Sequence, residues 1–202
     1  MISYPHIVFD LGCVLLDYTA DAAVRAYTSD PELIRTVSLI VFHSGEWTLL
    51  DAGLISEDDA LANFMSRCRT DEERRIAKLA FENWERFNLT PHPGMEQLLT
   101  ELKNSGYHMH ILSNISVRMS PERIREMLPN SELIDTVFTS SPHRCIKPQT
   151  LIYETFCKEA GLRAEDCFFI DDRADNITAA KEFGMGGYVF DGDVEKLRKL
   201  LV

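Results

Sequence analysis

Short apolar runs alternate with helical segments along most of this chain, and no other feature of the sequence constrains the fold as strongly. The runs are 7–9, 109–112, 136–139, 167–170 and 188–190, and each stops abruptly at polar residues. Continuous apolar runs of this length are typical of strands buried on both faces of a parallel sheet. Because helical patterns separate the runs, the sequence predicts an α/β fold with a doubly wound parallel sheet.

The helical segments of this sheet are marked by apolar residues at helical spacing. They are 94–105, 150–160, 174–183 and 193–201. Gly106, Gly161 and Gly184 follow the first three segments, where glycine is the common residue at a helix end. These boundaries fit a Rossmann-like core.

Residues 17–91 interrupt the alternation, because they contain several helical patterns and no clear strand. One helix is predicted to start at Pro31, and another has Ser56 as its N-cap, with acidic residues in its first turn. The sequence therefore predicts a core domain of residues 1–16 and 92–202 with a helical cap domain, residues 17–91, inserted after the first strand.

The composition excludes several classes of protein. With 202 residues and 45% hydrophobic content the chain can bury a core, and its net charge of −11 repels nucleic acid and anionic lipid. The five cysteines form no CxxC pair, which favours reduced thiols over a zinc site or a disulfide framework. No run approaches the ~20 apolar residues of a membrane span, and the start has no basic leader. We expect a cytoplasmic protein, and the sequence makes no prediction of its oligomeric state.

Three of the predicted strands end in polar side chains that suit a single site. Asp10, Ser113–Asn114 and Asp171–Asp172 follow the runs, and ligands of open α/β sheets bind beyond the carboxyl ends of the strands. The alternative interpretation is that these residues only form turns and caps.

If the acidic side chains converge, they repel one another. Two carboxylates ~4 Å apart repel by about 4 kcal/mol at an effective dielectric of about 20, and a hard cation such as Mg²⁺ removes this repulsion. A bound Mg²⁺ would attract a phosphate dianion, to which Ser113 offers a hydroxyl group and the backbone near Asn114 offers N–H groups. Lys147 precedes a predicted helix and can point its ammonium group at the same anion; the alternative is an ordinary solvated lysine.

Four segments of the chain, taken together, resemble a known family. FDLGCVLLD, ILSN, CIKP and FFIDDRADNITAAKEFG are similar, in order and spacing, to the four motifs of the haloacid-dehalogenase-like superfamily. The resemblance spans nearly the whole chain, and the predicted insertion lies where that family carries a helical cap.

The resemblance implies a role for each matching residue. Asp10 matches the nucleophile that forms an aspartyl-phosphate. Ser113 matches the hydroxyl residue that binds the phosphoryl group, with Asn114 beside it, and Lys147 matches the lysine that neutralises charge. Asp171 and Asp172 match the acidic pair at the metal, where Asp172 is the expected direct ligand. Asn176 matches a supporting position on the next helix. The implied function is a Mg²⁺-dependent phosphatase acting on a small phosphorylated metabolite such as a sugar phosphate.

Gly12 departs from the pattern of the family's phosphatases, which usually carry a second aspartate two residues after the nucleophile. That aspartate protonates the leaving group, and such help contributes about 10²–10⁴-fold to a rate. Gly12 can still offer its carbonyl oxygen to Mg²⁺. We therefore expect substrates with good leaving groups to be favoured, unless a water or a cap residue supplies the proton.

Two other functions fit the same motifs. A hydrolytic dehalogenase also lacks the second aspartate, but it needs no Mg²⁺, whereas the Asp171–Asp172 pair indicates a metal. A non-catalytic phosphate-binding protein could have lost its acid at Gly12, but the remaining motif residues are intact. Asp17, His43 and Trp47 could face the site, although packing or surface roles are expected for them, and Cys13 is expected to be a small buried residue.

Overall fold

The computed structural model describes residues 3–202 and contains the predicted parallel sheet; residues 1–2 of the predicted core lie outside this range. Its strands are β1 (His6–Phe9), β4 (His108–Ser113), β5 (Thr136–Thr139), β6 (Cys167–Asp171) and β7 (Gly186–Val189), in the order β5-β4-β1-β6-β7. The chain winds outward from β1 on one side and then on the other, so the doubly wound fold is confirmed.

The register of the sheet aligns the carboxyl ends of its central strands. Phe9 of β1 lies opposite Ile111 of β4 and Ile170 of β6. Since the strands are parallel, the polar residues that follow each of them reach the same edge. This alignment brings Asp10 close to Asp171 at the point where the strand order switches direction.

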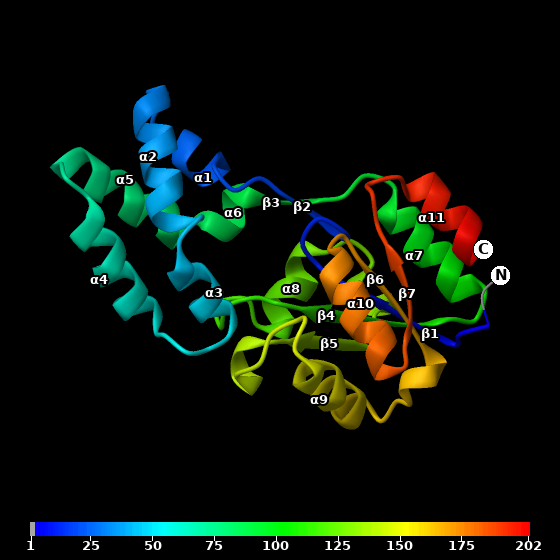
Figure 1. Ribbon diagram of the computed structural model, residues 1–202. Helices are drawn as coiled ribbons and strands as arrows, with labels where there is room; N and C mark the ends of the chain where they lie inside the picture. Colours follow the sequence, from blue (N-terminus) through cyan, green and yellow to red (C-terminus); the bar gives the residue numbers. More distant parts are fainter. Residues whose placement is uncertain (1–2) are drawn as a thin grey trace.

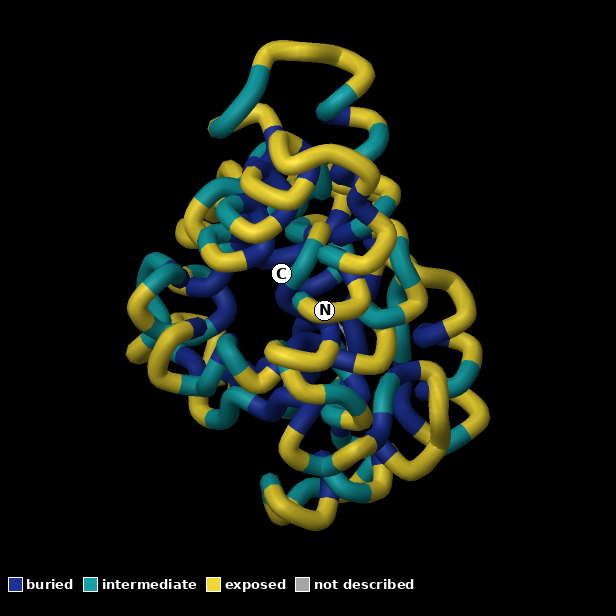
Figure 2. Tube along the Cα trace, turned by 90° about the vertical axis from the view of Figure 1, so that its left-hand side faces the viewer, coloured by how far each residue is buried: buried dark blue, intermediate teal, exposed yellow. Residues whose placement is uncertain are grey.

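Helices cover both faces of the sheet, as the alternation predicted (Figure 1). On one face α7 (Met95–Asn104), α8 (Pro121–Met127) and α11 (Val194–Leu201) pack against Ile7 and Phe9. On the other face α9 (Thr150–Ala160) and α10 (Ala174–Phe183) pack against Val8. The alternating sides of β1 are thus both fully buried, and Figure 2 shows the buried segments running through the interior.

Residues 17–91, called the helical insertion below, form a group of helices beside the sheet domain (Figure 1). They are α1 (Ala22–Arg25), α2 (Pro31–Val41), α3 (Gly45–Asp51), α4 (Glu57–Arg67), α5 (Asp71–Glu82) and α6 (Trp84–Asn88). Two predicted helix starts are confirmed. Pro31 is the first residue of α2, and the Ser56 hydroxyl accepts a hydrogen bond from the Asp59 N–H at 3.1 Å.

The prediction that residues 17–91 contain no strand is wrong at both ends of the segment. β2 (Leu16–Tyr18) and β3 (Leu89–Pro91) form an antiparallel ribbon between the insertion and the sheet (Figure 1). Strands this short carry no periodic pattern of their own, and their partners lie about seventy residues apart in the chain. The ribbon forms because the insertion leaves and returns at the same place.

Arg118, in the loop after β4, ties the insertion to the sheet domain. Its guanidinium group makes two hydrogen bonds of 2.9 Å to the Glu57 carboxylate and donates to the Phe81 carbonyl oxygen at 2.6 Å. Paired hydrogen bonds between arginine and a carboxylate are among the stronger polar contacts in proteins. Within residues 3–202, no helix has the length and apolar character needed to cross a membrane.

Candidate active site

Lys147 lies at the centre of the predicted site and contacts two carboxylates. Its Nζ is 2.7 Å from Asp10 Oδ1 and 2.7 Å from Asp171 Oδ2, and it donates to the Leu112 carbonyl oxygen at 3.0 Å. The side chain is 1% exposed. A lysine buried to this degree needs such partners, so the alternative of a solvated lysine is excluded.

Asp171 is held by hydrogen bonds on both oxygens. Oδ1 accepts from the Arg173 N–H and from Asn176 Nδ2, both at 2.9 Å, and Oδ2 accepts from Asn176 Nδ2 at 3.0 Å as well as from Lys147. These contacts fill the four acceptor positions of a carboxylate. Asp171 is therefore better placed to orient Lys147 than to bind a metal directly.

Asp10 and Asp172 each offer a carboxylate oxygen to the acidic cluster. Lys147 and the Leu11 N–H, at 2.7 Å, both contact Oδ1 of Asp10, so Oδ2 receives neither hydrogen bond. Asp172 is exposed at the edge of the sheet. Oxygens of Asp10, Asp171 and Asp172 lie within 4.8 Å of one another. A cluster of hard oxygen donors fits Mg²⁺, which prefers carboxylate and water ligands.

Asn114 fixes the backbone of the segment that carries Lys147. Its Nδ2 donates to the Lys147 carbonyl oxygen at 2.9 Å, and its Oδ1 accepts from the Lys147 N–H at 2.8 Å. Because both ends of this amide are engaged, Asn114 positions the lysine. Ser113, at the end of β4, is 2% exposed and lines the cavity beside Asp10.

Burial perturbs the titration of the cluster. It raises the pKa of Asp10 from 3.8 to about 7, since Lys147 only partly offsets the loss of solvation and Asp171 adds repulsion. Burial alone lowers the pKa of Lys147, but the two carboxylates outweigh it and the net shift is upward. Burial, followed by repulsion from Asp171, also raises the pKa of Asp172. A bound cation stabilises the charged form of these carboxyl groups and so lowers their raised pKa values.

A family model described as a haloacid dehalogenase-like hydrolase matches residues 5–184. The chain belongs to this family. A D-ribitol-5-phosphate phosphatase of Bacteroides thetaiotaomicron is 29% identical over 188 residues, with 89% of this chain and 88% of the relative covered. A sesquiterpene phosphatase of Aspergillus oryzae is 28% identical over 186 residues, with 89% and 86% covered.

A solved structure shares the fold of this hydrolase. It is a family enzyme from Bacteroides thetaiotaomicron in complex with magnesium and inorganic phosphate, with a TM-score of 0.71 and 19% identity. The comparison covers 96% of this chain and 98% of that one. The predicted family and fold are confirmed, and the relatives support the prediction of a phosphoric monoester hydrolase.

Two cavities of the hydrolase meet at Asp10. One, of about 180 Å³, is lined by Tyr18, Trp47, Trp84, Leu89 and Ser113, among others. The second, of about 390 Å³, is lined by polar groups that include Lys147, Arg173 and Asn176. Trp47 therefore faces the site as well as packing at 5.2 Å, centroid to centroid, against Trp84.

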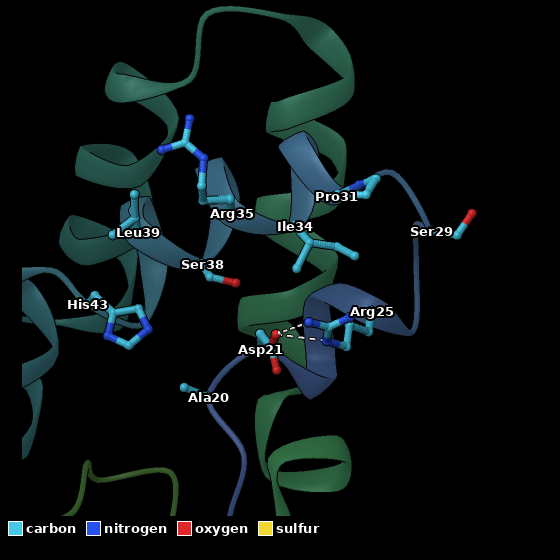
Figure 3. Close-up of a pocket in the computed structure, with 10 residues that line it drawn as sticks. All are labelled: Ala20, Asp21, Arg25, Ser29, Pro31, Ile34, Arg35, Ser38, Leu39 and His43. Carbon is cyan, nitrogen blue, oxygen red and sulfur yellow. Dashed lines mark hydrogen bonds and ion pairs between the residues drawn. The ribbon is translucent and has the colours of Figure 1, made fainter.

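His43 and Asp17 lie elsewhere. His43 lines a separate cavity of about 420 Å³ between α1 and α2, where an ion pair joins Asp21 and Arg25 (Figure 3). This cavity exceeds the one beside Ser113 in volume but contains no residue of the four motifs, so volume alone does not locate the site. Asp17 pairs with His92 across the β2–β3 ribbon. Cys13 was expected to be buried; it is exposed, because it occupies a turn with φ +58°.

Sequence reasoning missed Asp51, the last residue of α3. It lines both cavities beside Asp10. Burial, with a smaller effect of the Asp10 charge, raises the pKa of Asp51 to about 8. No motif marks this position, and its proximity to Asp10 depends on how the insertion folds back over the sheet.

Proposed function

We propose that this chain is a Mg²⁺-dependent phosphatase that hydrolyses a small phosphorylated metabolite, such as a sugar phosphate, through an aspartyl-phosphate on Asp10. The observation that carries this proposal is the buried contact of Lys147 with Asp10 and Asp171, at the edge where Asp172 completes an acidic cluster. The phosphatase names of the two relatives support the same class of reaction.

Asp10, Asp172 and the carbonyl oxygen of Gly12 would hold the metal, with Asp171 behind them. When bound, Mg²⁺ supplies positive charge that offsets the carboxylates and the phosphate dianion. Lys147 neutralises charge on Asp10 through its contact with Oδ1. This contact orients the carboxylate so that Oδ2 points away from the lysine. Ser113 would donate its hydroxyl hydrogen to a phosphate oxygen.

In the first step Oδ2 of Asp10 attacks phosphorus, and the bond from phosphorus to the ester oxygen breaks as that oxygen takes a proton. In the second step water attacks the phosphorus of the acyl phosphate, releases inorganic phosphate and restores Asp10. In each step the attack is in line, so the departing group lies opposite the attacking oxygen across the phosphorus atom. The carboxylate is thus regenerated without any oxidant or reductant.

The helical insertion would act as a cap over this chemistry, with residues 1–16 and 92–202 as the core domain. Its aromatic side chains Trp47 and Trp84 line the cavity beside Asp10. An apolar wall there excludes water and selects the organic part of the substrate. Arg118 would hold the cap in the closed position.

The acidic cluster favours a phosphatase over a dehalogenase. Displacement at carbon by a carboxylate needs no cation, and it gives no reason to gather three carboxylates within 4.8 Å. A chelator separates the two activities, because EDTA would abolish phosphate ester hydrolysis and leave dehalogenation intact. Phosphate release measured over a panel of metabolites, with and without Mg²⁺, provides this comparison.

Asp10→Asn tests the nucleophile. The amide keeps the shape of the side chain but cannot form the acyl phosphate, so turnover should fall to background while the far-ultraviolet circular dichroism is retained. Asp58→Asn, an exposed change of the same kind in α4, serves as the matched control and should keep full activity. Turnover by Asp10→Asn would falsify the assignment.

A further inference from the structure

Residue 12, where phosphatases of the family usually carry an aspartate, is a glycine, and the space beside its Cα atom is open. A Cβ atom added to Gly12 would meet nothing within 4 Å. The glycine therefore lines an open cavity and is not forced by packing. The proton that the ester oxygen needs must come from another group that reaches the cavity.

Asp51 is the acidic residue that the helical insertion contributes beside Asp10. Three residues line both cavities: Asp10, Asn114 and Asp51. The amide of Asn114 is already engaged with the backbone of Lys147. A substrate with its phosphoryl group on Asp10 and its organic part against the aromatic wall would place its ester oxygen at this junction, next to Asp51.

Contacts from the sheet domain fix the backbone around Asp51. Ser140, which is fully buried, donates its hydroxyl hydrogen to the Asp51 carbonyl oxygen at 2.5 Å and accepts from the Ile115 N–H at 2.9 Å. Two residues later Gly53 approaches the Ser141 backbone so closely that a Cβ atom there would collide with its carbonyl oxygen. The turn after α3 is therefore docked on the core next to Ser113–Asn114.

The Asp51 carboxyl group itself is free to act. Among residues 3–202 the Asp51 carboxylate oxygens make no hydrogen bond or ion pair. The charges that shift the pKa of Asp51 are those of Asp10 and Lys147, and its own charge raises the pKa of Tyr18. Arg173 lines the polar cavity with Asp51. Burial raises the pKa of this carboxyl group, and a carboxyl group that can hold and release a proton suits acid–base catalysis.

We propose that Asp51 is the general acid and base of the reaction, delivered from the helical insertion in place of the residue missing at Gly12. As the ester bond breaks, the protonated Asp51 carboxyl gives its proton to the departing oxygen and becomes a carboxylate. In the second step that carboxylate takes a proton from the attacking water and returns to its starting form. The proton balance closes over the cycle. The rate of the wild-type enzyme should then vary less with the pKa of the leaving group than the glycine at position 12 alone predicts.

Asp51→Asn tests this role when its activity is compared on two substrates that release leaving groups of different pKa. The amide keeps the size of the side chain, and the contact with Ser140 uses only the backbone of residue 51. We expect kcat/KM for a polyol phosphate, a poor leaving group, to fall about 10²–10⁴-fold, and that for nitrophenyl phosphate to fall less than tenfold. The alkaline limb of the pH profile for the polyol phosphate should disappear in the variant. Asp58→Asn, the exposed control in α4, should match the wild type on both substrates.

This inference rests on the proposed function, and the two fail differently. If the wild-type enzyme hydrolyses neither phosphate ester, both are overturned. If the wild type is active and Asp51→Asn loses activity equally on both esters, or loses none, only the proton-transfer role is overturned. An equal loss would mean that Asp51 serves to bind the substrate or to hold the insertion.

Discussion

Lys147→Met removes the charge at the centre of the site while keeping most of the volume of the side chain. The lysine is 1% exposed and makes two contacts of 2.7 Å, to Asp10 and to Asp171. Removing one partner of a buried ion pair costs about 3–5 kcal/mol, because the remaining charge has lost its solvation and its counterion. Two carboxylates remain here, so we expect a loss of free energy of unfolding at the upper end of that range.

The loss should depend on pH, with a sign set by Asp10. Its pKa is already raised to about 7 and rises further once Lys147 is gone. The folded variant then binds a proton more tightly than the unfolded chain, so its free energy of unfolding falls as the pH rises through the folded pKa. At about pH 5 Asp10 is protonated in both proteins and adds little to the loss. The loss is larger at about pH 8, where Asp10 of the wild type is charged against Lys147 and Asp10 of the variant has no such partner.

Urea unfolding in EDTA, followed by circular dichroism, measures both effects. Lys158→Met changes an exposed lysine on α9 and should shift the free energy of unfolding by about 0.5 kcal/mol or less. Adding Mg²⁺ should stabilise Lys147→Met at about pH 8, since a cation again offsets the carboxylates. A loss below about 1 kcal/mol, or one that is the same at both pH values, would refute the electrostatic reasoning.

Two further predictions concern the contact between the insertion and the sheet domain. Gly53→Ala should lower kcat/KM at least tenfold, because the added methyl group collides with the core. Gly161 has a similar φ of +69° but lies in open space, so Gly161→Ala is the control. It should lower the free energy of unfolding by about 1–2 kcal/mol without this loss of activity. Arg118→Ala breaks the paired hydrogen bonds to Glu57 and should raise KM while lowering the unfolding free energy by about 1–3 kcal/mol, measured by urea titration. Arg123→Ala, which removes an exposed ion pair, should change either quantity little, and an equal effect would count against the role of the insertion contact.

The sheet and most of its helices could be predicted because their signals are local. Apolar runs such as 7–9 and 167–170 are strands in the structure, and the helix predicted over 174–183 has those bounds. β7 begins two residues before the predicted run, because Gly186 pairs with β6 although glycine carries no apolar signal. The short helix α8 was not predicted.

The candidate site was partly predictable for the same reason. Asp10 follows β1 and Asp171 is the last residue of β6, and these strands pair directly, so the parallel topology alone brings the two residues together. The resemblance implies a lysine that neutralises the nucleophile, and the structure pairs Lys147 with Asp10. Its contact with Asp171 was not predicted. The role of Asn114 in holding the Lys147 backbone was not predicted, since an amide that binds substrate and one that binds backbone look alike in a sequence.

The sequence by itself determined the parallel sheet, the edge at which its polar residues meet and the acidic character of that edge, since the period of each segment and the ends of its strands are local properties. The β2–β3 ribbon and the placement of Asp51 beside Asp10 were decided only by the tertiary structure. They depend on the insertion returning to the sheet after about seventy residues and docking through Arg118, Ser140 and Gly53. Such contacts arise from the packing of distant surfaces, which leaves no periodic trace in the chain.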